Sequence, residues 1–104
     1  MNTRPAFDAA SYETPELAAL NLPLHGLGWD MIEAERALTA LNGAPRAEWD
    51  AQFAVVTAAR AAHAAALETC DAEVAAYCER ADAAEAAAAA AVTVAAREAE
   101  PALF

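Results

Sequence analysis

The stretch that decides the fold is residues 46–100, RAEWDAQFAVVTAARAAHAAALETCDAEVAAYCERADAAEAAAAAAVTVAAREAE, which contains no Gly and no Pro. Ala, Glu and Arg are strong helix formers, so this stretch predicts one helix of about 80 Å at 1.5 Å per residue. The alternative is a break at Thr69–Asp71, or at Asp82 with Glu85 three residues on. A break near residue 70 would fold the chain back into a monomeric three-helix bundle.

The residues before this stretch predict a shorter helix and a turn. Asp30 followed by Glu33 resembles a capping box, and Gly43 is the residue type that accepts the left-handed position after a helix. The apolar positions between them, at spacings of 3, 4 and 3, are Met31, Ala34, Leu38 and Leu41. With Pro45 restarting the chain, we expect an all-α helical hairpin, with a short helix at about 30–42 and a long helix at about 45–99.

Residues 1–28 carry weaker signals and are expected to form a separate part from the hairpin of 29–104. Residues 1–13 show no periodicity and predict an irregular arm. Thr14 and Pro15 are typical of a helix start, and Pro23 indicates a stop, so we expect a short helix at about 15–20. Residues 22–28 then form an apolar linker that lies across other helices.

A heptad seam runs along the predicted long helix. Apolar and other core-type residues alternate at spacings of 4 and 3, the pattern that keeps one stripe facing a partner helix in a coiled coil. Its first part is Trp49, Phe53, Val56, Arg60, His63, Leu67, Cys70, Val74 and Tyr77, and it continues through Ala81, Ala84, Ala88, Ala91 and Ala95. Small seam residues allow two helix backbones to approach closely.

Lengths suggest that the chain cannot cover this seam by itself. A helix starting near Asp30 reaches only from about Trp49 to Arg60, and the N-terminal arm can cover one further stretch. The seam from about His63 to Ala95 would then face water. We therefore expect it to bind protein, either a second copy in a homo-oligomer or a different chain.

The composition supports a need for close packing or for a partner. Of the 104 residues, 35 are Ala, so most of the 59% hydrophobic fraction consists of methyl groups that bury little area. Small domains are marginally stable to begin with. The stability that a small apolar core does not provide has to come from helix propensity, from close backbone contact or from a second chain.

The net charge of −10 favours some partners and disfavours others. An acidic chain without basic clusters repels phosphate, so direct nucleic-acid binding and adhesion to an anionic membrane are both disfavoured. A basic protein surface is the favoured partner, because long-range attraction speeds the encounter. All six basic residues are Arg and none is Lys. With so much Ala, this usage is typical of a GC-rich bacterium or phage.

The compartment that we expect is the bacterial host cytoplasm. The N-terminus is polar where a signal peptide would be apolar, and the longest uncharged stretch of the C-terminal half, residues 86–96, is too short to span a membrane. Cys70 and Cys78 in such a chain indicate free thiols in a reducing compartment.

No catalytic, cofactor or metal site is expected. His63 and Cys70 share one face but lie two turns apart, about 10.5 Å, which is beyond the reach of one metal ion. Cys78 points about 80° away from Cys70 on an ideal helix. A Cys–His nucleophile pair has the same defect, and no Gly-rich turn offers an oxyanion hole. We therefore predict that the protein is not an enzyme.

Two polar features have competing interpretations. Arg60 in the seam either pairs with a carboxylate on a partner and sets its alignment, or packs its stem while the guanidinium reaches water. An acidic flank is formed by Glu68, Asp71, Glu79, Asp82 and Glu85. It is either a solvated face or a row of carboxylates that imitates a phosphate backbone.

These interpretations lead to two function hypotheses. The first is a non-enzymatic helical assembly or adaptor protein that binds through the seam. The second is an acidic, phage-encoded inhibitor of the anti-CRISPR or anti-restriction type, which mimics nucleic acid and blocks a basic groove of a host complex.

Overall fold

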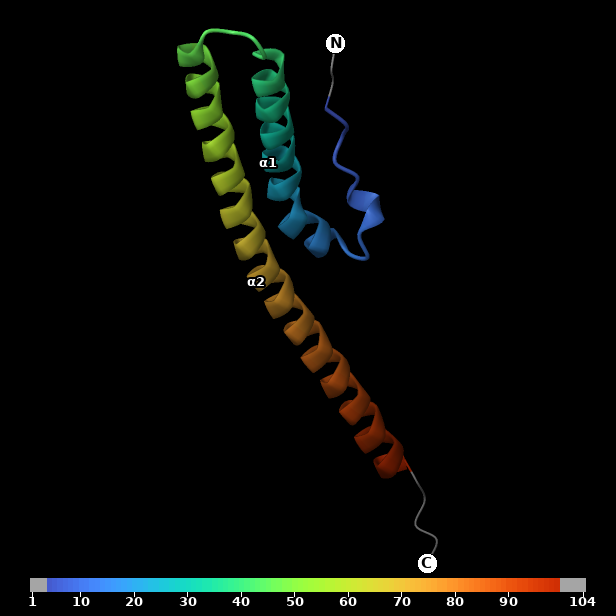
Figure 1. Cartoon of the computed structure of the whole chain (residues 1–104). Coiled ribbons are helices and arrows are strands. Elements are labelled where there is room, and N and C mark those ends of the chain that lie inside the picture. Colours follow the sequence, from blue (N-terminus) through green and yellow to red (C-terminus); the bar gives the residue numbers. More distant parts are fainter. Residues whose placement is uncertain (1–3, 100–104) are drawn as a thin grey trace, which may run out of the picture. The chain divides into compact units, whose positions relative to one another are not determined.

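The computed structural model describes residues 4–99 and shows an all-α helical hairpin, as predicted (Figure 1). A short 3₁₀ turn, η1 (Ala9–Ser11), precedes two helices, α1 (Pro15–Ala40) and α2 (Arg46–Ala99). Two compact units divide after Val74: the first holds the N-terminal arm, α1 and the first part of α2, and the second holds the rest of α2. The first three residues of the predicted arm lie outside the described residues.

Helix α2 is continuous from Arg46 to Ala99. The predicted single long helix is therefore confirmed, and the alternative breaks at residues 69–71 and at Asp82 do not occur. The carbonyl of Pro45 accepts the first two helical bonds, from the N–H groups of Glu48 (3.0 Å) and Trp49 (3.2 Å). An acidic first turn and a basic last turn, with Glu48 and Arg97, complement the helix dipole.

Helix α1 corrects the prediction for the N-terminal third of the chain. It begins at Pro15, where the Thr14 hydroxyl accepts the N–H of Leu17 at 3.1 Å, and it runs through Pro23 to Ala40. The predicted capping by Thr14 is confirmed. The predicted short helix of about 15–20, the irregular linker of 22–28 and the helix start near Asp30 are wrong, because all these residues belong to one helix.

The physical reason is that burial outweighs the local stop signals. An internal Pro removes one helical N–H bond and costs about 3 kcal/mol, but all six residues of 24–29 are partly buried once the helix continues. The side-chain amide of Asn21 adds a hydrogen bond to the carbonyl of Leu17 at 2.8 Å. The ribbon of α1 bends in its N-terminal part, where Pro23 lies, as a helix containing Pro commonly does (Figure 1).

The turn between the helices follows the glycine signal. Gly43 has φ of 85°, a left-handed conformation that glycine accepts, and it lies two residues after the C-cap Leu41. The N–H of Ala44 closes the turn on the carbonyl of Leu41 at 2.8 Å. The chain then reverses, and α1 lies beside the first part of α2 (Figure 1).

Two glycines should respond to the same substitution in opposite ways. Gly43→Ala is expected to destabilise the protein by about 1 kcal/mol, because an L-residue is strained at positive φ. Gly26→Ala is expected to stabilise it by about 0.5–1 kcal/mol, because Gly26 lies inside α1 and its added Cβ would meet nothing within 4 Å. Urea unfolding of both variants measures the difference, and shifts of the same sign would contradict the assigned turn.

The packing of α1 against α2 is antiparallel and rests on small side chains. The Gln52 amide donates to the backbone carbonyl of Ala34 at 3.0 Å, and the Cys70 thiol lies 3.5 Å from the side-chain oxygen of Asn21. Val56, between them on α2, is 0% exposed. The buried hydrophobic residues in the described part of the chain are Ala18, Ala34, Val56 and Cys70. The core is thin, as the Ala-rich composition suggests.

Candidate functional sites

Six of the nine large seam residues lie at positions that are at least partly buried. Val56 and Cys70 are buried, and Trp49, His63, Val74 and Tyr77 are half-buried. The other three members are exposed: Phe53, Arg60 and Leu67. In the first unit, the half-buried positions that alternate with Val56, His63 and Cys70 are Gln52, Ala59 and Ala66. Each lies one residue before the seam residue that the heptad pattern predicts to face inward. Phe53, Arg60 and Leu67, spaced by seven, therefore form an exposed edge of α2.

Aromatic stacking and an ion pair fix this exposed edge. The ring of Phe53 stacks on Trp49 with centroids 5.2 Å apart and planes 9° apart, and the Arg46 guanidinium lies 5.4 Å from the Trp49 centroid. Arg60 Nε donates to Glu35 Oε1 of α1 at 2.9 Å. Arg60 thus pairs with a carboxylate of its own chain. Both side chains are largely exposed, so the pair contributes about 0–1 kcal/mol.

The second unit exposes every described residue beyond Tyr77. From Cys78 to Ala99 each side chain of α2 is exposed, including the five Ala residues that continue the seam. Val92 and Val94 are 69% and 53% exposed. The role of the seam in partner binding stays a prediction. Within residues 4–99, this part of α2 is the longest stretch of helix that is open to solvent.

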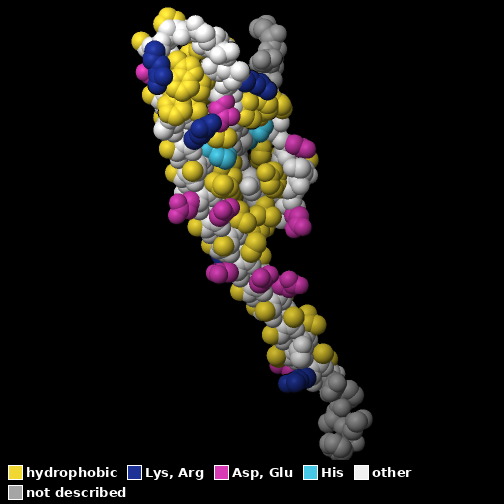
Figure 2. All heavy atoms as spheres, in the orientation of Figure 1, with side chains coloured by type: hydrophobic (Ala, Val, Ile, Leu, Met, Phe, Trp, Pro, Cys, Tyr) yellow, Lys and Arg dark blue, Asp and Glu magenta, His cyan; other side chains and the backbone are white. Residues whose placement is uncertain are grey.

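The acidic flank is exposed at all five of its positions: Glu68, Asp71, Glu79, Asp82 and Glu85. Asp and Glu side chains are spread widely over the face shown in Figure 2, with few Arg side chains between them. This arrangement fits a solvated face, and it equally leaves the carboxylates accessible to a basic surface.

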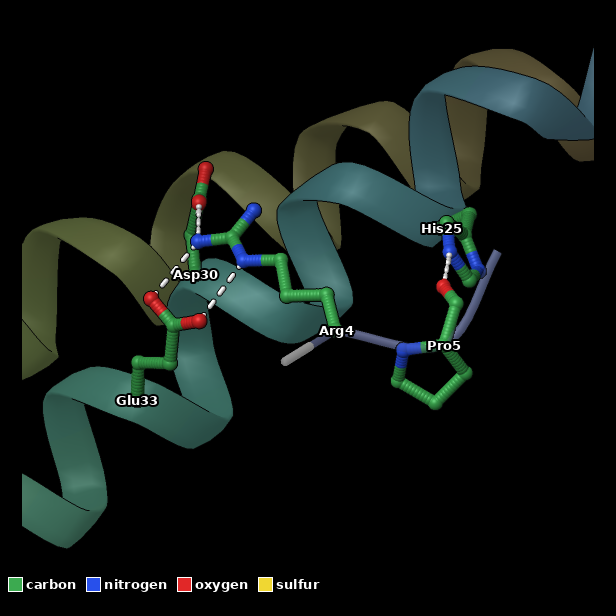
Figure 3. A network of polar contacts seen from close by, with 5 residues as sticks. All are labelled: Arg4, Pro5, His25, Asp30 and Glu33. Carbon is green, nitrogen blue, oxygen red and sulfur yellow. Dashed lines mark hydrogen bonds and ion pairs between the residues drawn. The ribbon is translucent and has the colours of Figure 1, made fainter. Parts of the chain in front are cut away.

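A polar network on α1 was missed by the sequence analysis (Figure 3). The guanidinium of Arg4 donates from Nε to Glu33 Oε1 at 2.6 Å and from Nη2 to Glu33 Oε2 at 2.7 Å. Nη2 also donates to Asp30 Oδ1 at 2.6 Å. These hydrogen bonds raise the pKa of Arg4, and the bonds from Arg4 lower the pKa of Glu33 below its ordinary value. The predicted capping box is wrong, because Asp30 and Glu33 lie inside α1 and bind Arg4 instead.

The next residues of the arm continue this contact with α1. His25 Nε2 donates to the backbone carbonyl of Pro5 at 2.8 Å, which requires the proton on Nε2. The Phe7 ring meets the His25 ring edge-on with centroids 5.5 Å apart, and it stacks on Tyr12 at 5.6 Å. One face of α1 therefore receives an extended segment through a charged group, a backbone carbonyl and an aromatic ring.

The sequence offered one signal for this network. Asp30 and Glu33 are three residues apart and so share a helix face if the helix already exists there. Once Asp30 is interpreted as the first residue of a helix, its carboxylate is assigned to the helix end and is no longer a partner for Arg4. The error in the helix start therefore concealed the site.

The two histidines and two cysteines do not converge on a metal. Among residues 4–99 there is no group of three or more His, Cys, Asp and Glu side chains that could hold an ion. His63 lies against the backbone of Gly28, with ring atoms 3.8 Å from where a Cβ would stand. Cys70 faces Asn21 beside an open groove of about 280 Å³, lined by Leu20, Pro23, Leu24, Ala65, Ala66, Thr69, Cys70 and Glu73. This volume lies just below the usual range for small-molecule sites.

The two thiols should differ strongly in reactivity. Burial, followed by the charges of Asp71 and Glu73, raises the pKa of Cys70, and its side chain is only 5% exposed. Cys78 is exposed. Because the thiolate is the nucleophile, we expect iodoacetamide at pH 8 to alkylate Cys78 at least about ten-fold faster than Cys70. Mass spectrometry of the peptides gives both rates, and equal rates in folded protein would contradict the burial of Cys70.

Comparison with known proteins does not place the chain in a family. No protein-family model matches it, and no curated protein or solved structure matches it either. Neither helix, over residues 4–99, has the length and apolar character that crossing a membrane requires. A proposal of function therefore rests on the faces described above.

Proposed function

We propose that this chain is a small, acidic, non-enzymatic assembly or adaptor protein that acts by binding another protein along α2. One observation carries the proposal: every described residue from Cys78 to Ala99 is exposed. Helices in proteins are stabilised mainly by the packing of one face, and this stretch buries no face in the described part of the chain. A bound partner would supply the missing contacts.

The surface suited to such a contact includes Val92 and Val94. By heptad spacing these two residues flank the Ala seam on its two sides, and they are 69% and 53% exposed. Full burial of a Val side chain is worth about 1.5–3 kcal/mol, so two such residues provide a substantial part of a binding free energy. The Ala residues between them would let a partner helix approach closely.

The partner that the charge favours is a basic protein. With a net charge of −10, long-range attraction to a basic surface raises the association rate, and salt screens that attraction. We place this interaction in the bacterial cytoplasm, where both thiols stay reduced. A homo-oligomer is the other form of assembly, and the mass of the purified protein would reveal it.

The test compares two Asp substitutions in the same segment. In Val92→Asp the charge enters the flank of the seam, and in Thr93→Asp it enters the opposite face of α2. Size exclusion with light scattering, on the purified protein and on the complex captured from host lysate, gives the masses. We expect Val92→Asp to weaken assembly at least about ten-fold, which is 1.4 kcal/mol, and Thr93→Asp to leave it unchanged. A strict monomer that captures nothing would contradict the proposal.

The second candidate function is an acidic inhibitor that mimics nucleic acid and blocks a basic groove of a host complex. The observation that favours it is the exposure of all five carboxylates of the acidic flank. Under this function, changing Glu68, Asp71, Glu79 and Asp82 to Gln or Asn abolishes binding, and binding weakens steeply with salt. Under the assembly function these changes matter little, whereas Leu67→Asp and Val92→Asp each weaken assembly.

A further inference from the structure

The face of α1 that carries His25, Asp30 and Glu33 holds a segment of extended chain through three kinds of recognition. Two carboxylates bind the guanidinium of Arg4, with Glu33 accepting from both Nε and Nη2. The ring N–H of His25 binds the backbone carbonyl of Pro5, the residue that follows. The same His25 ring meets the aromatic ring of Phe7. Figure 3 shows the polar part of this arrangement, with Arg4 and Pro5 on the arm and the other three residues on α1.

The arm is held by contacts that open easily. No residue of 4–14 is buried, and Phe7, Tyr12 and Thr14 are its only half-buried members. The side chains of Arg4 and Asp30 are 39% and 51% exposed in their ion pair, and exposed pairs contribute little to stability. The α1–α2 contacts at Ala34 and Gln52 do not involve the arm. The hairpin therefore has contacts of its own that do not depend on the arm.

We propose that this face of α1 is a docking site for an extended, arginine-bearing segment of a basic partner protein, and that the arm occupies the site in cis. The proposal goes beyond binding along α2, because it concerns a different helix and names the chemistry recognised. The segment carries Arg, then a residue whose carbonyl meets His25, then an aromatic residue three positions after the Arg. The acidity of the chain, with a net charge of −10, favours such a partner.

Arginine is required because of geometry and not charge only. Glu33 accepts two parallel hydrogen bonds from one guanidinium, an arrangement that the planar fork of Arg matches and the ammonium of Lys does not. Asp30 adds a third bond to the same Nη2. A Lys-bearing segment would keep the attraction and lose the paired bonds.

The arm makes the site self-inhibited. A segment tethered by a short linker acts at an effective concentration of about 1 mM or more, so a free segment has to compete with it. The apparent affinity of the site for a partner is lowered by the fraction of time that the arm is bound. Removing the arm's own contacts should therefore reveal the site.

The experiment uses the full-length chain and a fluorescein-labelled peptide with blocked ends, RPAFDAASY, which corresponds to Arg4–Tyr12. Fluorescence anisotropy measures its binding to the unchanged protein and to Arg4→Gln/Phe7→Ala, in which the arm has lost its charge and its ring. We expect the variant to bind at least about ten-fold more tightly, because the competing arm is weakened. A peptide with Lys in place of Arg should bind at least about five-fold less tightly than the original.

The matched control adds Asp30→Asn/Glu33→Gln to the Arg4→Gln/Phe7→Ala variant, and it should remove this gain in affinity. Circular dichroism of each variant verifies that the hairpin remains helical. The proposal is overturned if the Arg4→Gln/Phe7→Ala variant and the unchanged protein bind the peptide equally. It is also overturned if loss of the Asp30 and Glu33 carboxylates leaves binding intact.

A second measurement on the unchanged chain does not depend on any variant folding. Peptide at millimolar concentration should accelerate hydrogen exchange of the Ser11 and Tyr12 amides, which bond to the carbonyls of Asp8 and Ala9 in the docked arm. The amides of residues 50–70 should stay unchanged, and absence of this difference also overturns the proposal. Light scattering tests whether the arm of a second copy of this chain occupies the site. Dimers of the unchanged protein that disappear in Arg4→Gln would show arm exchange between two copies, and would overturn the assignment to a different protein.

Discussion

Replacing Val56 with Asp is expected to unfold the hairpin of α1 and the first part of α2. Val56 is the one fully buried large side chain in the described part of the chain, at 0% exposure. The substitution removes about 1.5–3 kcal/mol of apolar burial and places a carboxylate where water is excluded, which costs several kcal/mol more. A small domain has about 5 kcal/mol in total, so little of the folded state should remain. Tryptophan fluorescence, from Trp29 and Trp49 together, and circular dichroism in urea measure the loss.

Val55 provides the matched control, because it is the same residue type one position earlier in α2. Its side chain is 52% exposed. Val55→Asp makes the same chemical change in water and should alter the free energy of unfolding by no more than about 0.5 kcal/mol. If the two variants were equally stable, the face of α2 that meets α1 would be assigned wrongly.

Ala34→Leu is the second substitution with a large expected effect, a loss of about 2 kcal/mol. Ala34 is 8% exposed, and its carbonyl accepts the Gln52 amide, so the two helices are close together at this point. A larger side chain has to push α1 away from α2 or adopt a strained rotamer, and overpacking of this kind costs about 1–3 kcal/mol. Urea unfolding measures the change.

Ala37→Leu tests whether the effect comes from crowding and not from the residue type. Ala37 is exposed on the same helix, three residues further on. Leu and Ala have similar helix propensity, so this variant should stay within about 0.5 kcal/mol of the unchanged protein. A similar loss in both variants would show that the close approach at Ala34 does not limit packing.

The parts of the fold that follow from local rules were predicted from the sequence. The absence of Gly and Pro after Arg46 predicts α2, and Gly43 predicts the turn, because both depend on backbone conformation within a few residues. The N-terminal half of α1 was not predicted. Pro23 and two glycines are correct signals of local weakness, but the helix continues because residues 24–29 gain burial from parts of the chain that local rules do not see.

The inward face of α2 was predicted only in part, and the reason differs from the one for α1. Every seventh residue, from Trp49 through Val56 and His63 to Cys70, is at least half-buried, as the pattern suggests. The alternate positions are filled by Ala59 and Ala66, which the pattern treats as neutral, while the larger Leu67 lies at the edge. In a chain with 35 Ala, an Ala facing inward cannot be distinguished from one facing water by spacing.

The pairing of the arm with α1 could not be predicted from the sequence, because it joins residues that are far apart. Arg4 and Glu33 are separated by 29 positions, and Pro5 and His25 by 20. No periodic pattern relates such residues. The site depends on the correct start of α1, so one error in a helix boundary concealed all of it.

The contact between Gln52 and the carbonyl of Ala34 has a consequence for how the hairpin keeps its alignment. Methyl groups are nearly identical from turn to turn, so two Ala-lined helices could slide past each other by one turn, about 5.4 Å, and pack almost as well. The glutamine amide reaches a single backbone carbonyl, and the bonds from Arg60 to Glu35 and from Cys70 to Asn21 add two further fixed points. Without these polar contacts, α1 and α2 would shift among neighbouring registers while both remained fully helical.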